Sequence, residues 1–236
     1  MNQEKNKNEL VLEWFGHSCF RINIKDLSFF LDPVRKNKML GTTLDPFNEK
    51  NTKAIFISHD HWDHFNVETI MALLSPTTDV YCPYSVANSL AHRMTFEAQN
   101  QTELEALKES VIPIKNDEVF EIERISVKCL AASEGVSFLF NYGDKKLLFM
   151  GDSVATKEMI MEKPNVVLFP MWAVLGEEAK KKEFLELGTG CKCIPMHYHR
   201  DPDALPNFYI SSEDYQDLLQ MKIDMMLPEK DRTFRL

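Results

Sequence analysis

The amino-acid sequence predicts an α/β protein, in the broad sense that includes α+β folds, in which β-sheets pack on each other and helices cover their outer faces. Two observations favour this class. Short apolar runs bounded by turn residues indicate strands, and segments with apolar residues at helical spacing indicate helices. One order of elements, strands first and then strands alternating with helices, occurs twice along the 236 residues.

The first half begins with a predicted antiparallel meander. Its strands are expected over residues 10–15, 19–24 and 28–31, joined by short turns that contain glycine or charged residues. Residues 33–51 then form a loop of mixed polar character. Because this loop is too long for a tight turn, we expect it at the rim of a site.

Strands and helices alternate in the rest of the first half. Apolar spacing predicts a strand, a helix, a strand and a helix in turn, over residues 54–57, 67–74, 80–82 and 85–94. Residues 99–109 are polar and charged with few apolar positions. That composition favours either a mobile connection or an exposed helix.

The second half repeats this plan. Strands come first and are predicted over residues 119–122, 125–130, 136–142 and 146–149. Helices and strands then alternate, with helices over 155–161, 177–187 and 212–221 and strands over 166–169 and 192–195. Each sheet needs its second face covered, so we expect the helices outside the sheets.

Composition narrows the function classes. A formal charge of −9, from 36 acidic and 27 basic residues, argues against a nucleic-acid surface, because phosphate binding needs a basic footprint. No apolar run is long enough to span a membrane and the polar start shows no signal peptide, so we expect a cytoplasmic protein. The cysteines form no Cys-x-x-Cys pair, so reduced thiols are expected at Cys19, Cys82, Cys129, Cys191 and Cys193.

Residues 59–64 read His-Asp-His-Trp-Asp-His and give the strongest functional signal in the chain. Three of the seven histidines lie here, directly after a predicted buried strand. Imidazole and carboxylate groups are the usual ligands of zinc, manganese and iron. His59 and His61 can hold one ion, while Asp63 and His64 can turn toward a second. Two neighbouring ions form a centre suited to hydrolysis.

Two later strands also end in ligand-type residues. Asp152 follows Gly151 after the apolar run 147–149, and a carboxylate placed there is suited to bridging two cations. His197 follows the predicted strand 192–195. Each signal is weak alone, because Gly-Asp is a common turn and a single histidine is more often structural. Three strand ends with ligand-type residues nevertheless indicate one site at an edge of a layered fold.

Together these motifs resemble the metallo-β-lactamase superfamily, and within it the small metal-dependent hydrolases similar to ascorbate-phosphate lactonase. The resemblance implies a four-layered αββα sandwich, formed by a single domain over residues 10–236 after a polar tail over 1–9. It covers nearly the whole chain, and the motifs follow the family's order: Trp14-Phe15-Gly16-His17-Ser18-Cys19-Phe20, Leu31-Asp32-Pro33, the block 59–64, Gly151-Asp152 and Pro195-Met196-His197-Tyr198.

The resemblance also implies two divalent metal ions, zinc or manganese, with iron as a further candidate. Six residues match the family's ligand positions, two for the first ion, three for the second and one bridge: His59 and His61, then Asp63, His64 and His197, then Asp152. Asp63 would orient a metal-bound hydroxide that attacks an anionic ester-type substrate. Phosphodiesters, phosphorylated lactones and thioesters are the candidate substrates.

One family ligand is missing, because Ser133 or Glu134 stands where the first ion normally takes a third histidine. Glu134 can replace it through oxygen, which favours manganese or iron. Alternatively the first ion keeps His59, His61, Asp152 and water, or the first site is lost and one metal remains. We expect an altered but retained site, because the other ligand positions are filled. The alternative function is a non-catalytic or mononuclear metal-binding protein.

Three further residues are candidates for supporting or substrate-binding roles. Asp32 can accept the second ring proton of a ligand histidine and fix its tautomer, or it can simply form an Asp-Pro turn. His17, in a Gly-His-Ser turn, has the same two interpretations. His199 is a fallback ligand or a substrate contact.

The expected partner is a small anionic substrate, with no membrane involvement, and a homo-oligomer is compatible with the sequence. Arg35, Lys36 and Lys38 in the long loop can hold a phosphate, although exposed basic residues in loops are usually just solvated. Trp62 and Trp172 are candidates for lining the pocket, although aromatic residues after strands commonly belong to the core.

Overall fold

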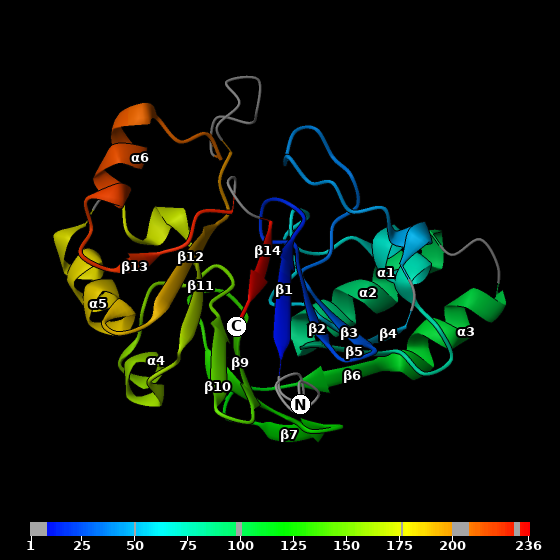
Figure 1. Cartoon of the computed structure of the whole chain (residues 1–236). Helices are drawn as coiled ribbons and strands as arrows, with labels where there is room; N and C mark the ends of the chain where they lie inside the picture. Colours follow the sequence, from blue (N-terminus) through cyan, green and yellow to red (C-terminus); the bar gives the residue numbers. More distant parts are fainter. Residues whose placement is uncertain (1–8, 50, 98–100, 176, 200–207, 229–231) are drawn as a thin grey trace, which may run out of the picture. The chain divides into compact units, whose positions relative to one another are not determined.

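The structure is a computed structural model in which the chain forms two compact units (Figure 1). It describes residues 9–49, 51–97, 101–175, 177–199, 208–228 and 232–236. Unit 1 consists of Met1–Asn37, Thr42–Lys115 and Arg232–Leu236, and unit 2 consists of Lys38–Gly41 and Asn116–Asp231.

Unit 1 is built on a mixed sheet with the strand order β14-β1-β2-β3-β4-β5-β6. Neighbours from β14 to β3 are antiparallel, and those from β3 to β6 are parallel. Pro113 lies in β6 at the edge of this sheet, where the missing proline N–H is tolerated. The strands are β1 (Leu10–Trp14), β2 (Phe20–Ile24), β3 (Leu27–Leu31), β4 (Thr52–Phe56), β5 (Asp79–Pro83), β6 (Val111–Ile114) and β14 (Thr233–Arg235).

The helices of unit 1 pack on this sheet (Figure 1). They are α1 (Val67–Leu73), α2 (Tyr84–Glu97) and α3 (Gln101–Ser110), with a short 3-10 turn η1 (Pro46–Asn48) in the long loop. Asn66 caps α1, since its side chain accepts a 2.9 Å hydrogen bond from the Thr69 backbone N–H. Ile55, Ile70 and Leu90 from β4, α1 and α2 belong to one buried cluster. This cluster fixes the strand that leads into the histidine block.

Unit 2 is built on a second mixed sheet, with the order β13-β12-β11-β10-β9-β8-β7. Strands β7 to β10 are antiparallel and β10 to β13 are parallel, so this sheet has the same plan as the first. The strands are β7 (Val119–Ile122), β8 (Ile125–Ala131), β9 (Val136–Tyr142), β10 (Lys145–Phe149), β11 (Val166–Pro170), β12 (Lys192–Met196) and β13 (Asp224–Met225).

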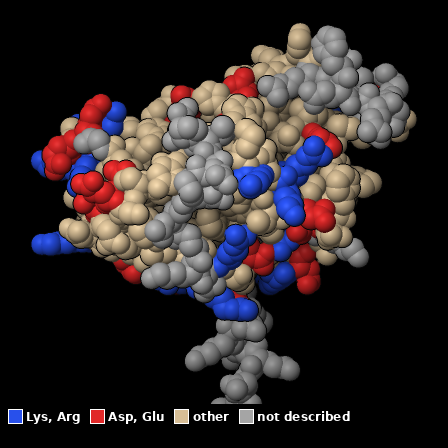
Figure 2. Space-filling view, turned by 90° about the horizontal axis from the view of Figure 1, so that it is seen from above, with Lys and Arg blue, Asp and Glu red and all other residues tan. Residues whose placement is uncertain are grey.

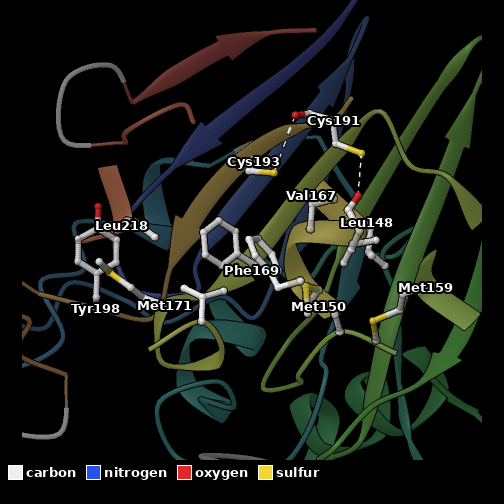
Figure 3. Packing of buried hydrophobic residues seen from close by; sticks show 14 of the residues in the cluster. Leu148, Met150, Met159, Val167, Phe169, Met171, Cys191, Cys193, Tyr198 and Leu218 are labelled. Carbon is white, nitrogen blue, oxygen red and sulfur yellow. Dashed lines mark hydrogen bonds between the residues drawn. The ribbon is translucent and has the colours of Figure 1, made fainter. Parts of the chain in front are cut away.

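The helices of unit 2 cover its sheet with a large apolar core. They are α4 (Lys157–Glu162), α5 (Glu178–Gly188) and α6 (Ser212–Leu219), with a 3-10 turn η2 (Met171–Ala173) after β11. Leu148, Val167 and Met159 belong to the buried cluster shown in Figure 3. The rings of Phe169 and Phe184 lie 4.3 Å apart between centroids. This core holds the carboxyl ends of β10, β11 and β12 in register.

These two mixed sheets flanked by helices confirm the predicted α/β class. The predicted strands and helices are present with boundaries shifted by a few residues, and residues 101–110 form helix α3 rather than an irregular connection. Strands β13 and β14 were missed because they have only two and three residues, and β6 was missed because Pro113 interrupts its strand pattern. Residues 1–8 of the predicted polar tail lie outside the described residues, and the single-domain boundary stays a prediction.

None of the helices formed by the described residues combines the length and the apolar character that crossing a bilayer requires. All five cysteines are free and buried, as the sequence predicts for reduced thiols.

Candidate metal centre

The histidine block leaves the sheet of unit 1 at the end of β4. Ile57 before the block and Phe65 after it are both buried, so both ends of the block are anchored in the core. Between them the chain turns tightly, because the His61 carbonyl accepts hydrogen bonds from the backbone N–H groups of His64 (3.0 Å) and Phe65 (2.8 Å). This turn buries His64 and leaves His61 exposed.

A buried carboxylate, Asp32, organises the inner side of the block. It follows β3, the strand beside β4, and has 0% exposure. Its Oδ1 accepts from the Ser58 backbone N–H at 2.7 Å. Its Oδ2 accepts from the Ser58 hydroxyl at 2.6 Å and lies 2.6 Å from Nδ1 of His64. Asp32 therefore makes the histidine contact expected for a residue that orients a ligand.

A second histidine, His17, approaches the block from the turn between β1 and β2. Its Nε2 lies 3.0 Å from Oδ2 of Asp63, and both side chains are buried. The indole Nε1 of Trp14 donates to the His17 carbonyl at 2.9 Å, which holds the turn in place. Asp63 is thus held by a residue 46 positions earlier in the chain.

Ligand-type atoms of unit 1 gather closely enough to hold cations. Within 4.8 Å of one another lie atoms of Asp32, His59 and His64, and also atoms of His17, Asp63 and His64. Oδ2 of Asp63 and Nε2 of His64 are 3.6 Å apart, and the rings of His59 and His61 lie 4.6 Å apart between centroids. Because each ligand atom lies about 2.0–2.2 Å from zinc in tetrahedral geometry, two ligand atoms of one ion are about 3.4 Å apart. The donor set therefore fits a divalent cation.

Unit 2 carries its own ligand-type pair. Asp152 and His197 follow β10 and β12, whose carboxyl ends meet at one edge of the parallel part of the sheet. Oδ2 of Asp152 lies 3.1 Å from Nε2 of His197, and each residue is less than 10% exposed. Gly151 has a φ of 57°, so the turn before Asp152 requires a left-handed conformation that glycine adopts easily.

Ser133, which stands where the family has its third histidine, forms hydrogen bonds within unit 2. The Ser133 backbone N–H donates to Ser153 Oγ at 3.0 Å, and the Ser133 hydroxyl accepts from the Val154 N–H at 3.3 Å. Ser133 therefore joins the β8–β9 turn to the loop that carries Asp152. Glu134, the other candidate replacement ligand, is exposed in the same turn.

His199, the candidate substrate contact, also lies in unit 2. Its backbone N–H donates to the Phe208 carbonyl at 2.6 Å, and the N–H of Ile210 donates to the His199 carbonyl at 3.0 Å. The imidazole packs against Gly41, where an added Cβ would lie 2.1 Å from the ring. A glycine at this position is thus required for the observed placement of His199.

Charged side chains of both signs lie on the surface of the described residues. Figure 2 shows Lys and Arg side chains next to Asp and Glu side chains on the face it presents. Arg35, a candidate phosphate contact in the long loop, forms an ion pair with Glu68, whereas Lys36 is exposed. The aromatic candidates Trp62 and Trp172 are 48% and 38% exposed, so neither is a core residue.

Ser58 is the site residue that sequence reasoning missed. It has 0% exposure and contacts both Asp32 and His59. Its only sequence signal is its position directly before His59, and serine is common in turns. Nothing in the spacing of the motif distinguishes a hydrogen-bonding serine from a turn serine.

Comparison with known proteins assigns the chain to a family. The model of the beta-lactamase superfamily domain matches residues 29–201, which is more than half of the chain. A UPF0173 metal-dependent hydrolase from Aeropyrum pernix is 22% identical over 223 residues, covering 89% of this chain and 90% of that protein. One from Sulfurisphaera tokodaii is 26% identical over 80 residues, which cover 34% of this chain and only 35% of that protein.

Solved structures share the fold. The metallo hydrolase Igni18 from Ignicoccus hospitalis aligns with a TM-score of 0.69 at 18% identity, covering 97% of this chain and 98% of that chain. This likeness supports the predicted metallo-β-lactamase αββα fold.

Proposed function

Since the chain belongs to the family of the beta-lactamase superfamily domain, we propose that it is a metal-dependent hydrolase acting on a small anionic ester-type substrate. Its relatives from Aeropyrum pernix and Sulfurisphaera tokodaii are named metal-dependent hydrolases. The observation that carries the proposal is the buried cluster of imidazoles and carboxylates at the carboxyl ends of β3 and β4. Burying so many ionisable groups is costly, and a bound cation offsets that cost.

We assign the six family positions as metal ligands: His59, His61, Asp63, His64, Asp152 and His197. A divalent cation, with zinc or manganese preferred and iron as a further candidate, lowers the pKa of bound water toward about 7 and so supplies a nucleophile at neutral pH. Asp63 would orient the attacking water, and His17 contacts the Asp63 carboxylate at 3.0 Å. Asp32 supports His64.

The substrate is proposed to be a phosphodiester, a phosphorylated lactone or a thioester. A cationic centre favours such anionic or carbonyl groups. Lys36 is a candidate for the anionic part of the substrate because it is exposed, whereas Arg35 already pairs with Glu68. The free buried thiols favour a reducing compartment, so we propose a cytoplasmic location.

A second candidate function is a protein with one metal ion, or one that binds metal without catalysis. It is favoured by the hydrogen bonds of Ser133, whose hydroxyl holds the Val154 loop at the position of the missing histidine. Glu134 remains the alternative oxygen ligand. Elemental analysis after metal-replete purification separates these states, since two ions per chain support the two-metal hydrolase and one ion supports the mononuclear form.

The test of hydrolysis compares Asp63→Asn with Asp60→Asn. Asp60 lies in the same block, but its Oδ2 accepts from the Ser89 hydroxyl at 2.8 Å, a bond that asparagine retains. We expect Asp63→Asn to lower kcat/KM by at least about 100-fold and to weaken metal binding, because loss of a ligand charge affects both. Asp60→Asn should stay within a few-fold of the wild type.

The measurements are metal content and kcat/KM on phosphodiester, lactone and thioester substrates. Full activity in Asp63→Asn would exclude the proposed role of Asp63. Absence of any bound metal in the wild type after metal-replete purification would exclude the hydrolase proposal itself.

A further inference from the structure

We propose that Ser58 is a positioning residue that transmits the orienting effect of Asp32 to His59, so that one buried carboxylate fixes the tautomers of two ligand histidines. This inference rests on the proposed function, because it concerns how His59 and His64 are prepared to bind metal. All of its residues lie in unit 1.

The direction of each hydrogen bond follows from the number of protons available. The Ser58 hydroxyl donates its one proton to Oδ2 of Asp32, at 2.6 Å. The same hydroxyl oxygen lies 2.9 Å from Nδ1 of His59. Because the hydroxyl proton is already used, Nδ1 of His59 must be the donor in this second bond.

The same reasoning applies directly to His64. Its Nδ1 lies 2.6 Å from Oδ2 of Asp32, so Nδ1 carries the ring proton and donates it. In each histidine the lone pair that can bind a metal is then at Nε2. Asp32 contacts His64 directly, and it reaches His59 through the Ser58 hydroxyl.

Burial makes this arrangement specific. Asp32, Ser58 and His64 have 0% exposure and His59 has 3%. In such surroundings a misplaced proton leaves a buried polar group without its partner, which is unfavourable. The Ser58 backbone N–H also donates to Asp32 at 2.7 Å, so both groups of Ser58 hold the same carboxylate and the relay has little freedom to rearrange.

The primary test determines the ring tautomers in the metal-free protein. Nitrogen NMR of ¹⁵N-histidine-labelled chain at about pH 8, above the ordinary imidazole pKa of about 6.5, separates Nδ1–H from Nε2–H forms. His59→Gln and His64→Gln spectra assign the signals. We expect both residues in the Nδ1–H form in the wild type. An Nε2–H proton on His59 in the wild type would overturn the proposal without any variant of Ser58.

Variants of Ser58 then test the relay. In Ser58→Ala we expect His59 to populate the Nε2–H form while His64 stays Nδ1–H, and we expect the affinity of the ion bound by His59 to fall about 10–100-fold. Ser58→Thr keeps the hydroxyl and should preserve the wild-type tautomer. An unchanged His59 tautomer in folded Ser58→Ala would contradict the inference.

Thr78→Val is the matched control. Thr78 is also buried in unit 1, and its hydroxyl donates at 2.7 Å to the Thr52 carbonyl at the start of β4, whereas Ser58 lies beyond the end of that strand. Thr78→Val should lower the free energy of unfolding about as much as Ser58→Ala does, but it should leave the tautomer of His59 unchanged. Because the tautomers are read without metal or substrate, failure of the hydrolase proposal and failure of this inference give different results.

Discussion

Among single residues, Gly41 is the position where backbone conformation and side-chain packing coincide. Its φ is +64°, and an added Cβ would lie 2.1 Å from Cδ2 and Nε2 of the His199 ring. We expect Gly41→Ala to lower the free energy of unfolding by more than the roughly 1–2 kcal/mol of left-handed strain alone. Urea unfolding followed by circular dichroism measures the change.

Gly190 provides the control for backbone strain. Its φ is +79°, but nothing lies within 4 Å of an added Cβ, so Gly190→Ala should show the strain alone. In a His199→Ala background, Gly41→Ala should cost about as much as Gly190→Ala. Equal costs of the two glycine substitutions in the wild-type background would mean that His199 is not held by this contact.

At the scale of secondary-structure elements, charged residues attach α4 to the sheet of unit 2. Nζ of Lys128 on β8 lies 2.7 Å from Oε1 of Glu162 and 3.1 Å from Oε1 of Glu158. Nζ of Lys146 on β10 donates to the Glu162 carbonyl at 2.9 Å. The hydrogen bond from Lys128 is the main cause that lowers the pKa of Glu162, and the same bond raises the pKa of Lys128.

We expect Glu162→Gln to lower the free energy of unfolding by about 0.5–1 kcal/mol at pH 7. A carboxyl group with a lowered pKa in the folded state stabilises the fold above its unfolded pKa, and this contribution is lost as the pH falls through the folded pKa. The difference between variant and wild type should therefore be constant from pH 6 to 8 and disappear in acid. Urea unfolding across this range measures it, and a difference that persists below the lowered pKa would contradict the assignment.

An exposed glutamate of α5 supplies the comparison for this prediction. Glu183→Gln removes the same charge from the same unit, and Glu183 is exposed. Surface changes of this kind usually stay within about 0.5 kcal/mol.

Considered as a whole, the molecule keeps its thiols out of reach of solvent. Burial raises the pKa of Cys19, Cys82, Cys129 and Cys193 to about 12, and it raises that of Cys191 as well. A raised pKa leaves almost no reactive thiolate at pH 8. We therefore expect no thiol to react rapidly with a disulfide reagent such as DTNB in the native protein, and five to react after unfolding. Rapid reaction of a native thiol would show that its burial is incomplete.

Local periodicity accounts for the part of the fold that the sequence predicts. The strands around the histidine block and the helices α1 and α5 have apolar patterns of their own, so their place in the chain can be read directly. Strand β14 cannot, because it pairs with β1 from the opposite end of the chain and has three residues. Its pairing depends on the complete tertiary structure.

Some residues of the candidate site can likewise be predicted from the sequence, and others cannot. The block containing His59 and His64 is visible because ligand-type residues are rare and clustered. The contacts of Asp32 and His17 were foreseen only as one of two interpretations, since a turn residue and a supporting residue look alike in sequence. Ser58 was missed because its role depends on where its one hydroxyl proton points.

Three residues with proposed roles in the site adopt a backbone conformation that most side chains avoid. The φ angles of His17, Asp32 and His197 are 50°, 40° and 59°. Such strain costs on the order of 1–3 kcal/mol for each residue and is found where function requires a particular side chain. The metal-free protein is therefore less stable than its sheets and cores would allow. A cation that binds only the folded chain raises the melting temperature by mass action, so cellular metal supply would also govern how long the protein survives.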